Sequence, residues 1–297
     1  MGYVIGKGGA TLKKLAAETG AQVTTPRRGT PNDQSFVTVA AAEEACVARA
    51  LVRLELLVDS LLSSPKSAPY NYFLSIPLLR AGDEAAQAAL RGLHASLVDA
   101  ARTGAAERLV EAMVVAPERM HLTVCMLKLY SERAREACRQ ALRRCRDELQ
   151  ALTGGDAMRF ALAGLGVMKG GPDSARVVHL EVADRAPRAR VQAVADALVA
   201  RMGEAGLLRE GDGGPVRLHA TVINTRHAAK PPPGEGGQRG GRRGADGGKP
   251  EAVDATGILD EFGDREIAEL TPREVHLSRR GEYGEDGYYL PADVVSI

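Results

Sequence analysis

Apolar residues recur along this chain with two different spacings, and each spacing predicts one kind of secondary structure. Apolar positions three to four residues apart predict helices over 10–20, 43–62, 83–101, 131–152 and 188–205. Alternation of apolar and polar positions predicts strands over 21–26, 35–40, 70–78, 120–130, 158–168, 175–183, 216–224, 274–280 and 287–295. Helices that alternate with strands, followed by strand pairs late in the chain, predict an α+β or mixed α/β fold.

Two segments interrupt this pattern and divide the chain. The stretch 64–69 is rich in serine and proline and is typical of a linker, so we expect one domain over 1–63 and a second over 70–297. The segment at about 228–250 is rich in Gly, Pro and Arg and cannot build a core, so we expect a disordered insertion there. Its "RGGRRG" run could follow an RNA backbone, but a solvated insertion is the favoured interpretation.

Composition narrows the classes of function. The chain has 39 Lys and Arg against 38 Asp and Glu, so nucleic-acid binding has to come from local patches and not from bulk charge. The helix over 43–62 carries Arg49, Arg53, Glu55 and Asp59, so it is amphipathic and no membrane span is expected. The four cysteines form no C-x-x-C pair and have no histidine at zinc spacing, so we expect buried free thiols and no metal site.

A glycine-rich loop, Gly6-Lys7-Gly8-Gly9, lies between an apolar pair and a predicted helix near the start of the chain. Glycines let the backbone approach a phosphodiester closely, the helix start supplies free N–H groups, and Lys7 adds a positive charge. The loop alone is a weak signal, because an ordinary helix start also explains it. Followed by helix, strand, loop, strand and helix, it resembles a type I KH domain, whose G-x-x-G loop holds about four nucleotides of single-stranded nucleic acid.

This resemblance has one departure. A KH domain of this type begins with a strand and a first helix, whereas only "MGYVI" precedes Gly6 here. We therefore expect a KH-like domain that lacks its first strand and most of its first helix, with its apolar face partly uncovered. The resemblance implies that Gly6, Lys7, Gly8 and Gly9 bind RNA or single-stranded nucleic acid.

Two copies of one short pattern, His-x-Thr-Val, are the candidates for catalysis. They are His121-Leu-Thr123 and His219-Ala-Thr221, both on predicted strands and both preceded by an arginine two positions earlier. Residues i and i+2 of a strand share a face, so each copy presents an imidazole and a hydroxyl together. A single copy is best explained as a core histidine beside a threonine, but two copies in one frame indicate a duplicated site. Two histidines can cleave a phosphodiester without a metal, one accepting and one donating a proton, while threonines bind the phosphate oxygens.

Paired His-x-Thr motifs on two lobes resemble the two-histidine (2H) phosphoesterase superfamily, which includes 2′,3′-cyclic phosphodiesterases and RNA-ligase-like hydrolases. Together with the KH loop, the segments "NYFLSIPL", "HLTVCMLKL", "LHATVINT" and "HLSRRGEYGEDGYY" are similar to proteins in which a KH domain precedes a 2H domain of the A-kinase anchor protein 7 type. The resemblance implies catalytic roles for His121, Thr123, His219 and Thr221, with no cofactor and no metal. It leaves open which histidine is the acid and which the base.

The remaining histidines and the tyrosines near these motifs are rival candidates. A third pattern, His276-Leu-Ser278, is followed by arginines and not by an apolar run, so a structural or peripheral role is favoured. Tyr72, Tyr288 and Tyr289 are candidates for the wall of the cleft, although a core position is the simpler interpretation. No function is expected for the other histidines, which are His94, His179 and His227.

Two functions therefore remain open. The first is an RNA-binding phosphoesterase that cleaves RNA phosphodiesters or opens 2′,3′-cyclic phosphates. The alternative is a non-catalytic adaptor that binds RNA or a nucleotide. In both cases the resemblance implies a nuclear protein, with a cytoplasmic pool left open, that works with a helicase-containing coactivator complex in transcription and alkylation-damage repair. Intact His and Thr in both motifs favour catalysis, because an adaptor has no need of both pairs.

Overall fold

The structure, a computed structural model, describes residues 5–26, 36–63, 69–153, 158–168, 170–183, 186–208, 212–228 and 251–297. Contacts within the chain divide it into two compact units, one of residues 1–69 with 130–132 and one of residues 70–129 with 133–297. Most of the predicted linker and nearly all of the predicted insertion at 228–250 lie outside the described residues. Among the helices that the structure describes, none has the length and apolar character needed to cross a membrane.

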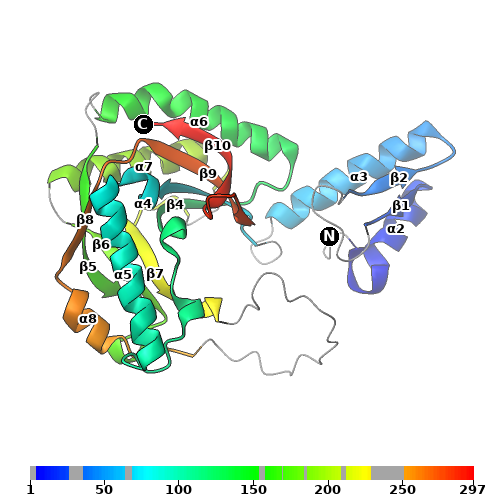
Figure 1. Cartoon of the computed structure of the whole chain (residues 1–297). Helices are drawn as coiled ribbons and strands as arrows, with labels where there is room; N and C mark the ends of the chain where they lie inside the picture. The colour runs from blue at the N-terminus through cyan, green and yellow to red at the C-terminus, as the bar shows by residue number, and fades with distance from the viewer. Residues whose placement is uncertain are drawn as a thin grey trace. The chain divides into compact units, whose positions relative to one another are not determined.

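The first unit combines two helices with a two-stranded sheet (Figure 1). The glycine loop forms a 3₁₀ turn, and the elements in order are η1 (Lys7–Gly9), α2 (Ala10–Thr19), β1 (Gln22–Thr24), β2 (Thr38–Ala40) and α3 (Glu44–Ser63). The two strands are antiparallel, with Val23 opposite Val39. Leu15, Ala21 and Ala50 form the buried core, against which these valines pack half-buried. The predicted order of helix, strand, strand and helix after the glycine loop is confirmed.

One antiparallel sheet of eight strands forms the centre of the second unit, in the order β10-β9-β3-β4-β7-β6-β5-β8. Its strands are β3 (Tyr72–Pro77), β4 (His121–Leu127), β5 (Phe160–Val167), β6 (Val177–Val182), β7 (His219–Asn224), β8 (Glu266–Leu270), β9 (Glu274–Tyr283) and β10 (Tyr289–Ser296). The middle strands β4 and β7 pair at Leu122 and Ala220. The sheet therefore consists of two four-stranded halves joined at this short seam.

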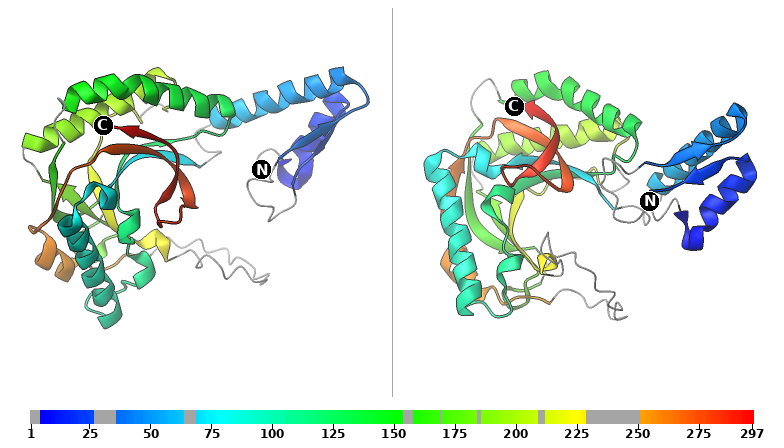
Figure 2. Two further views of the ribbon diagram at one scale, coloured as in Figure 1. Left: turned by 45° about the horizontal axis from the view of Figure 1, so that its top comes forward. Right: turned by 45° about the vertical axis from the view of Figure 1, so that its right-hand side comes forward.

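Helices cover the sheet of the second unit. They are α4 (Leu78–Ala81), α5 (Glu84–Thr103), α6 (Glu132–Thr153), α7 (Ala186–Glu204) and α8 (Thr256–Phe262). In both views of Figure 2, α6 and α7 lie side by side, and α5 lies along β8. The Asp83 side chain caps α5 by accepting a hydrogen bond of 2.9 Å from the backbone N–H of Ala86. The buried face of α6 repeats every three to four residues, through Cys138, Leu142, Cys145 and Leu149.

The two faces of the sheet differ in chemistry. On one face, alternate residues such as Leu74, Leu122, Leu180, Ala220 and Leu277 belong to a single apolar core that includes the inner sides of α5, α6 and α7. The residues between them point to the other side. We call that side the polar face and define it by Ser75 on β3, His121 and Thr123 on β4, His179 and Glu181 on β6, His219 and Thr221 on β7, and His276 and Ser278 on β9.

The pattern of apolar residues did not predict α8 and β8, which follow the insertion. The helix α8 has seven residues and the strand β8 has five, so neither is long enough to show a clear periodic pattern of apolar residues. The prediction of free thiols is confirmed, because all four cysteines are unpaired. Cys125, Cys138 and Cys145 are buried, as predicted, while Cys46 is half-buried.

Candidate active site

The two His-x-Thr motifs meet at the seam between the halves of the sheet. Their middle residues, Leu122 and Ala220, lie opposite each other in an antiparallel pair. In that register each histidine neighbours the threonine of the other motif, and all four side chains are half-buried on the polar face. The structure therefore brings the four predicted catalytic residues together, and these are His121, Thr123, His219 and Thr221.

Each motif holds its imidazole in the same way. His121 Nδ1 lies 2.7 Å from the carbonyl oxygen of Arg119, and His219 Nδ1 lies 2.7 Å from the carbonyl oxygen of Arg217. A carbonyl oxygen can only accept a hydrogen bond, so in both rings Nδ1 carries a proton and donates it. The neutral form of each ring then has its free lone pair at Nε2, which is the atom available to accept or deliver a proton.

Aromatic rings surround His121. The ring centroids of Phe73, Tyr289 and Tyr288 lie 5.0, 5.4 and 6.4 Å from that of His121. Burial among these groups lowers the pKa of His121 to about 4, with a smaller decrease from the charge of His219, and the hydrogen bond to the backbone of residue 119 only partly opposes this shift. His121 is therefore neutral at neutral pH, which suits a proton acceptor.

His219 has different neighbours, which come from β6. Glu181 is its direct partner across the two strands, and His179 lies opposite Thr221. The ring of His179 lies 5.4 Å from that of His219, with the planes at 83°. His179 is buried; its burial lowers its pKa, and the charges of His219 and Arg217 act in the same direction. Sequence reasoning set His179 aside because no Ser or Thr follows two residues later, and only the strand register places it here.

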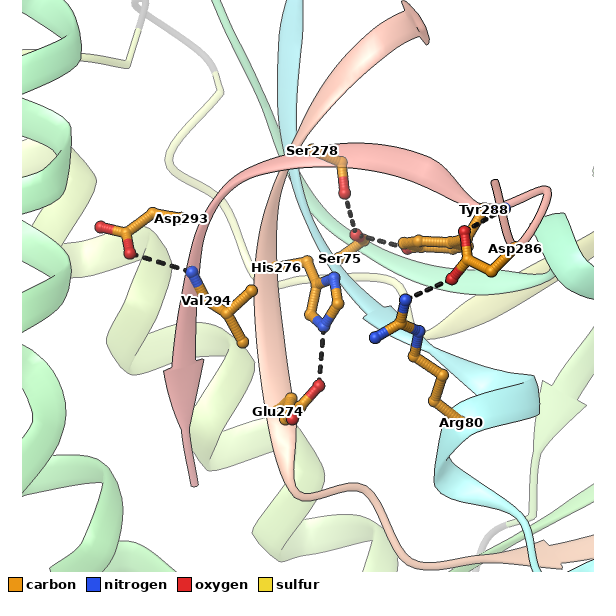
Figure 3. A network of polar contacts seen from close by, with 9 residues as sticks. All are labelled: Ser75, Arg80, Glu274, His276, Ser278, Asp286, Tyr288, Asp293 and Val294. Atoms are coloured by element: carbon orange, nitrogen blue, oxygen red, sulfur yellow. Dashed lines mark hydrogen bonds and ion pairs between the residues drawn. The ribbon is translucent and has the colours of Figure 1, made fainter. Parts of the chain in front are cut away.

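The third motif also lies on the polar face, and its side chains are fully buried. His276 is opposite Ser75 in the register of β3 and β9, and Ser278 follows on the same face. The Ser75 hydroxyl shares hydrogen bonds with the hydroxyls of Ser278, at 3.2 Å, and Tyr288, at 2.8 Å (Figure 3). Since β3 separates β9 from β4, this motif supports the aromatic wall beside His121 and does not reach the seam. Its geometry fits the structural role that the sequence favours.

Two polar pairs flank this hydroxyl network (Figure 3). His276 Nε2 donates a hydrogen bond of 2.9 Å to the Glu274 carboxylate, and Arg80 pairs with Asp286. Asp286 Oδ1 also accepts a hydrogen bond of 3.1 Å from the backbone N–H of Tyr288. Burial lowers the pKa of His276, and the carboxylate of Glu274 partly opposes this effect. The turn between β9 and β10 is thus tied to α4, and this keeps Tyr288 in the wall.

Arg119 links that turn to the first motif. Its guanidinium carbon lies 4.0 Å from the ring centroid of Tyr283, and its Nε donates a hydrogen bond of 3.5 Å to the carbonyl oxygen of Gly287. Its own carbonyl oxygen accepts the hydrogen bond from His121. One residue therefore orients the imidazole through its backbone and the aromatic wall through its side chain.

The three tyrosines proposed for the cleft wall have different positions. Tyr288 and Tyr289 lie beside His121, and Tyr288 is buried. Tyr72 lies on the opposite face of β3 with Leu74, in the apolar core, so the structure does not bring it to the site. Of the two remaining histidines, His94 lies on α5 and His227 lies in the turn η6 (Thr225–His227).

The glycine loop of the first unit has a backbone that few other residues could adopt. Gly6, Gly8 and Gly9 have φ angles of 71°, 62° and 78°. A Cβ at Gly6 would lie 2.2 Å from the Thr11 hydroxyl, whereas a Cβ at Gly8 or Gly9 would meet nothing within 4 Å. Lys7 and Gly8 are exposed. The loop thus presents open backbone and a cation at the start of α2, which suits a phosphodiester.

Comparisons with known proteins give matches over both units. Residues 70–297 match the family model of the AKAP7 2'5' RNA ligase-like domain, and residues 1–56 match that of the KH domain. A curated relative, "Activating signal cointegrator 1 complex subunit 1" of Mus musculus, is 27% identical over 97% of this chain and 78% of its own length. The resemblance to a KH domain followed by a 2H domain is thereby confirmed.

Solved structures include weaker likenesses to the second unit. E. coli LigT complexed with NADP+ is 18% identical, with 77% of this chain and 99% of that chain covered and a TM-score of 0.42. A structure described as a phosphoesterase is 17% identical, with the same coverage and a TM-score of 0.40. The match over residues 70–297 shows that the chain belongs to the AKAP7 2'5' RNA ligase-like family, with a KH domain preceding that domain.

Proposed function

We propose that this protein is an RNA-directed phosphoesterase that acts through the two His-x-Thr motifs without a metal ion. The observation that supports this proposal is the pairing of the motifs at the seam of the sheet. Two imidazoles, each held through Nδ1, stand beside two threonine hydroxyls on one face. Proton transfer and hydrogen bonding to phosphate oxygens are the two operations that phosphodiester cleavage requires.

In cleavage of RNA, one imidazole accepts the proton of a ribose 2′-hydroxyl at Nε2 while the 2′-oxygen attacks phosphorus. The bond between phosphorus and the 5′-oxygen breaks, and the other imidazole gives its Nε2 proton to that oxygen. The products are a 2′,3′-cyclic phosphate and a 5′-hydroxyl end. Opening of a cyclic phosphate follows the same scheme with water as the nucleophile. The hydroxyls of Thr123 and Thr221 donate hydrogen bonds to the non-bridging oxygens, where negative charge accumulates.

The decisive experiment is turnover by the full chain on oligoribonucleotides and on 2′,3′-cyclic nucleotides. His121→Ala and His219→Ala should each lower kcat by about 10²- to 10⁴-fold, because each removes one proton-transfer group. His94→Ala, on α5, is the matched control and should leave turnover unchanged. Wild-type turnover should persist in a chelator, since neither step uses a metal. Unchanged turnover in both cleft variants would refute the proposal.

The KH domain supports a second part of this proposal, the binding of RNA by the glycine loop. A wild-type chain that binds RNA but shows no turnover on either substrate class would identify the protein as the non-catalytic adaptor. We infer no such role from the geometry, because an adaptor has no need of two proton-transfer groups at one seam.

The name of the mouse relative describes a complex subunit, and on that ground we extend the proposal to assembly. This chain acts in the nucleus as a subunit of a helicase-containing coactivator complex that serves transcription and alkylation-damage repair. Precipitation of the tagged full chain from nuclear extract should recover a helicase. Recovery of no helicase, or a chain confined to the cytoplasm, would contradict this part.

A further inference from the structure

His179 is a third histidine beside the two motifs, and nothing in its local sequence marks it. It lies opposite Thr221 in the register of β6 and β7, while Glu181 on the same strand lies opposite His219. Both side chains are therefore on the polar face, on the β6 side of the second motif. The rings of His179 and His219 are 5.4 Å apart, which is direct contact between neighbouring strands.

The backbone of β5 makes room for this arrangement. Gly166 is the residue of β5 opposite His179. A Cβ at Gly166 would lie 2.8 Å from Glu181 Oε1 and 3.3 Å from His179 Nε2. Any side chain at this position would thus displace one or both groups.

The hydrogen bonding of His179 is incomplete. Its side chain is 1% exposed, yet within the part of the chain that the structure describes neither of its ring nitrogens has a hydrogen-bond partner. The nearest charge is the Glu181 carboxylate, whose Oε1 lies 3.6 Å from His179 Nε2. Buried polar atoms are rarely left unpaired, so such a group calls for an explanation beyond packing.

Among the residues that the structure describes, no carboxylate or second histidine from a neighbouring strand pairs with His121 in the way that Glu181 and His179 pair with the second motif. Its surroundings are the rings of Phe73, Tyr288 and Tyr289, which exclude water and supply no carboxylate. The two motifs, alike in their own hydrogen bonds, therefore differ in what lies around them. Burial among these rings disfavours a charged imidazole, whereas a nearby carboxylate favours one.

We propose that His179 and Glu181 are positioning residues for His219, which hold its ring and stabilise its protonated form, so that His219 is the proton donor of the pair and His121 the acceptor. This inference rests on the proposed phosphoesterase function. The titratable and charged groups around His219 are His121 from β4, His179 and Glu181 from β6, and Arg217, two residues before it, whose carbonyl oxygen holds Nδ1.

The signs of these charges support the assignment. Arg217 lowers the pKa of His179 and Glu181 raises it, and Glu181 is also the direct cross-strand partner of His219. Burial lowers the pKa of His179, so that ring stays neutral and can lie against a charged His219 without repulsion. The lowered pKa of His121 keeps the acceptor free of a proton. During cleavage His121 therefore takes the 2′-hydroxyl proton, and His219 protonates the departing 5′-oxygen.

The test compares two substrates that differ in their leaving group. A dinucleotide such as uridylyl-adenosine needs a proton on its 5′-oxygen, whereas uridine 3′-(4-nitrophenyl phosphate) releases a stable phenolate without one. In the full chain, His179→Phe and Glu181→Gln should lower kcat for the dinucleotide on the order of tenfold, part of what an acid contributes, with KM unchanged. The basic limb of the pH profile should move to lower pH. Turnover of the nitrophenyl ester should change less than about twofold.

The controls separate this inference from the function on which it rests. Glu269→Gln removes another exposed carboxylate, on β8, and should leave both substrates unaffected. Equal losses on the two substrates, or no loss on either, would overturn the inference while the proposed function stands. If His179→Phe fails to fold, the exposed Glu181→Gln decides alone. Absence of wild-type turnover on both substrates would overturn the proposed function and this inference with it.

Discussion

The hydroxyls of Ser75, Ser278 and Tyr288 lie behind the aromatic wall and lead to a prediction about stability. The third of three successive substitutions should restore part of the stability that the second removes. Ser75 and Ser278 are fully buried, and Tyr288 is 3% exposed. Ser75 hydrogen-bonds to both partners, and the Ser278 hydroxyl lies close enough to Tyr288 to lower its pKa. Any two of the three hydroxyls can therefore pair with each other, but a single one left behind has no partner within the group.

The magnitudes follow from the difference between a lost hydrogen bond and an unpaired buried group. Ser75→Ala leaves two hydroxyls that still pair, so it should cost about 1 kcal/mol. Ser75→Ala with Ser278→Ala leaves the Tyr288 hydroxyl buried and unpaired, which adds about 1–3 kcal/mol. Adding Tyr288→Phe removes that last hydroxyl, so the triple variant should regain about 1–2 kcal/mol over the double variant.

The assay is urea unfolding of the full chain followed by circular dichroism, with thermal melting as a second measure. For a unit of this size, 1 kcal/mol corresponds to roughly 2–4 °C in Tm, so the double variant should melt about 4–16 °C below wild type. Ser296→Ala, an exposed serine on β10, is the matched control and should stay within about 0.5 kcal/mol of wild type. A triple variant less stable than the double variant would refute the reasoning.

Three further tests concern the glycine loop, the first histidine and two glycines of the second unit. Lys7→Glu should weaken binding of single-stranded RNA about tenfold and reduce the slope of log Kd against log salt, as fluorescence anisotropy measures; an unchanged slope would contradict the proposed contact. The pKa of His121, lowered to about 4, should place the acid limb of kcat/KM near pH 4. The unfolded chain protonates His121 more readily than the folded chain does, so the folded state is most stable above pH 6.5 and loses this contribution to stability as the pH falls through about 4. An acid limb of kcat/KM near pH 6.5 would contradict the lowered pKa. Gly164 has a φ angle of 81°, and a Cβ there would lie 2.6 Å from the Gly263 carbonyl oxygen, so Gly164→Ala should destabilise the fold by about 1–3 kcal/mol. Gly92 is exposed on α5, so Gly92→Ala should stabilise the fold by up to about 1 kcal/mol. Shifts of Tm in the same direction for both variants would contradict the steric argument.

Local rules were enough to predict part of the site. The spacing of two predicted that His121 and Thr123 share a face, because the direction of side chains along a strand depends only on the strand itself. The same alternation groups Tyr72 with Leu74 and Ile76, and this grouping was the signal that Tyr72 belongs to the core. The elements α8 and β8 were missed because short elements carry little periodicity.

Register could not be predicted in this way. Which residue of β6 lies beside His219 depends on the alignment of two strands that are far apart in the sequence, and an irregularity between Val178 and His179 shifts that alignment. His179 therefore gave no sign of its position. The same holds for Ser75, whose role depends on a serine and a tyrosine about 200 residues further along the chain.

The two motifs have the same local structure, yet the proposed chemistry needs them to differ. Each follows an arginine whose carbonyl oxygen holds Nδ1 at 2.7 Å, so the local sequence makes the two imidazoles equivalent. One step of cleavage requires a neutral ring and a protonated ring at the same time. That difference has to come from the neighbouring strands, aromatic on the side of β3 and β10 and charged on the side of β6. His276 supports the same conclusion. It precedes Ser278 by two residues, as His121 precedes Thr123, but it is buried on β9, away from the seam. The position of a motif in the sheet, and not its spacing alone, therefore decides whether it can act on a phosphate.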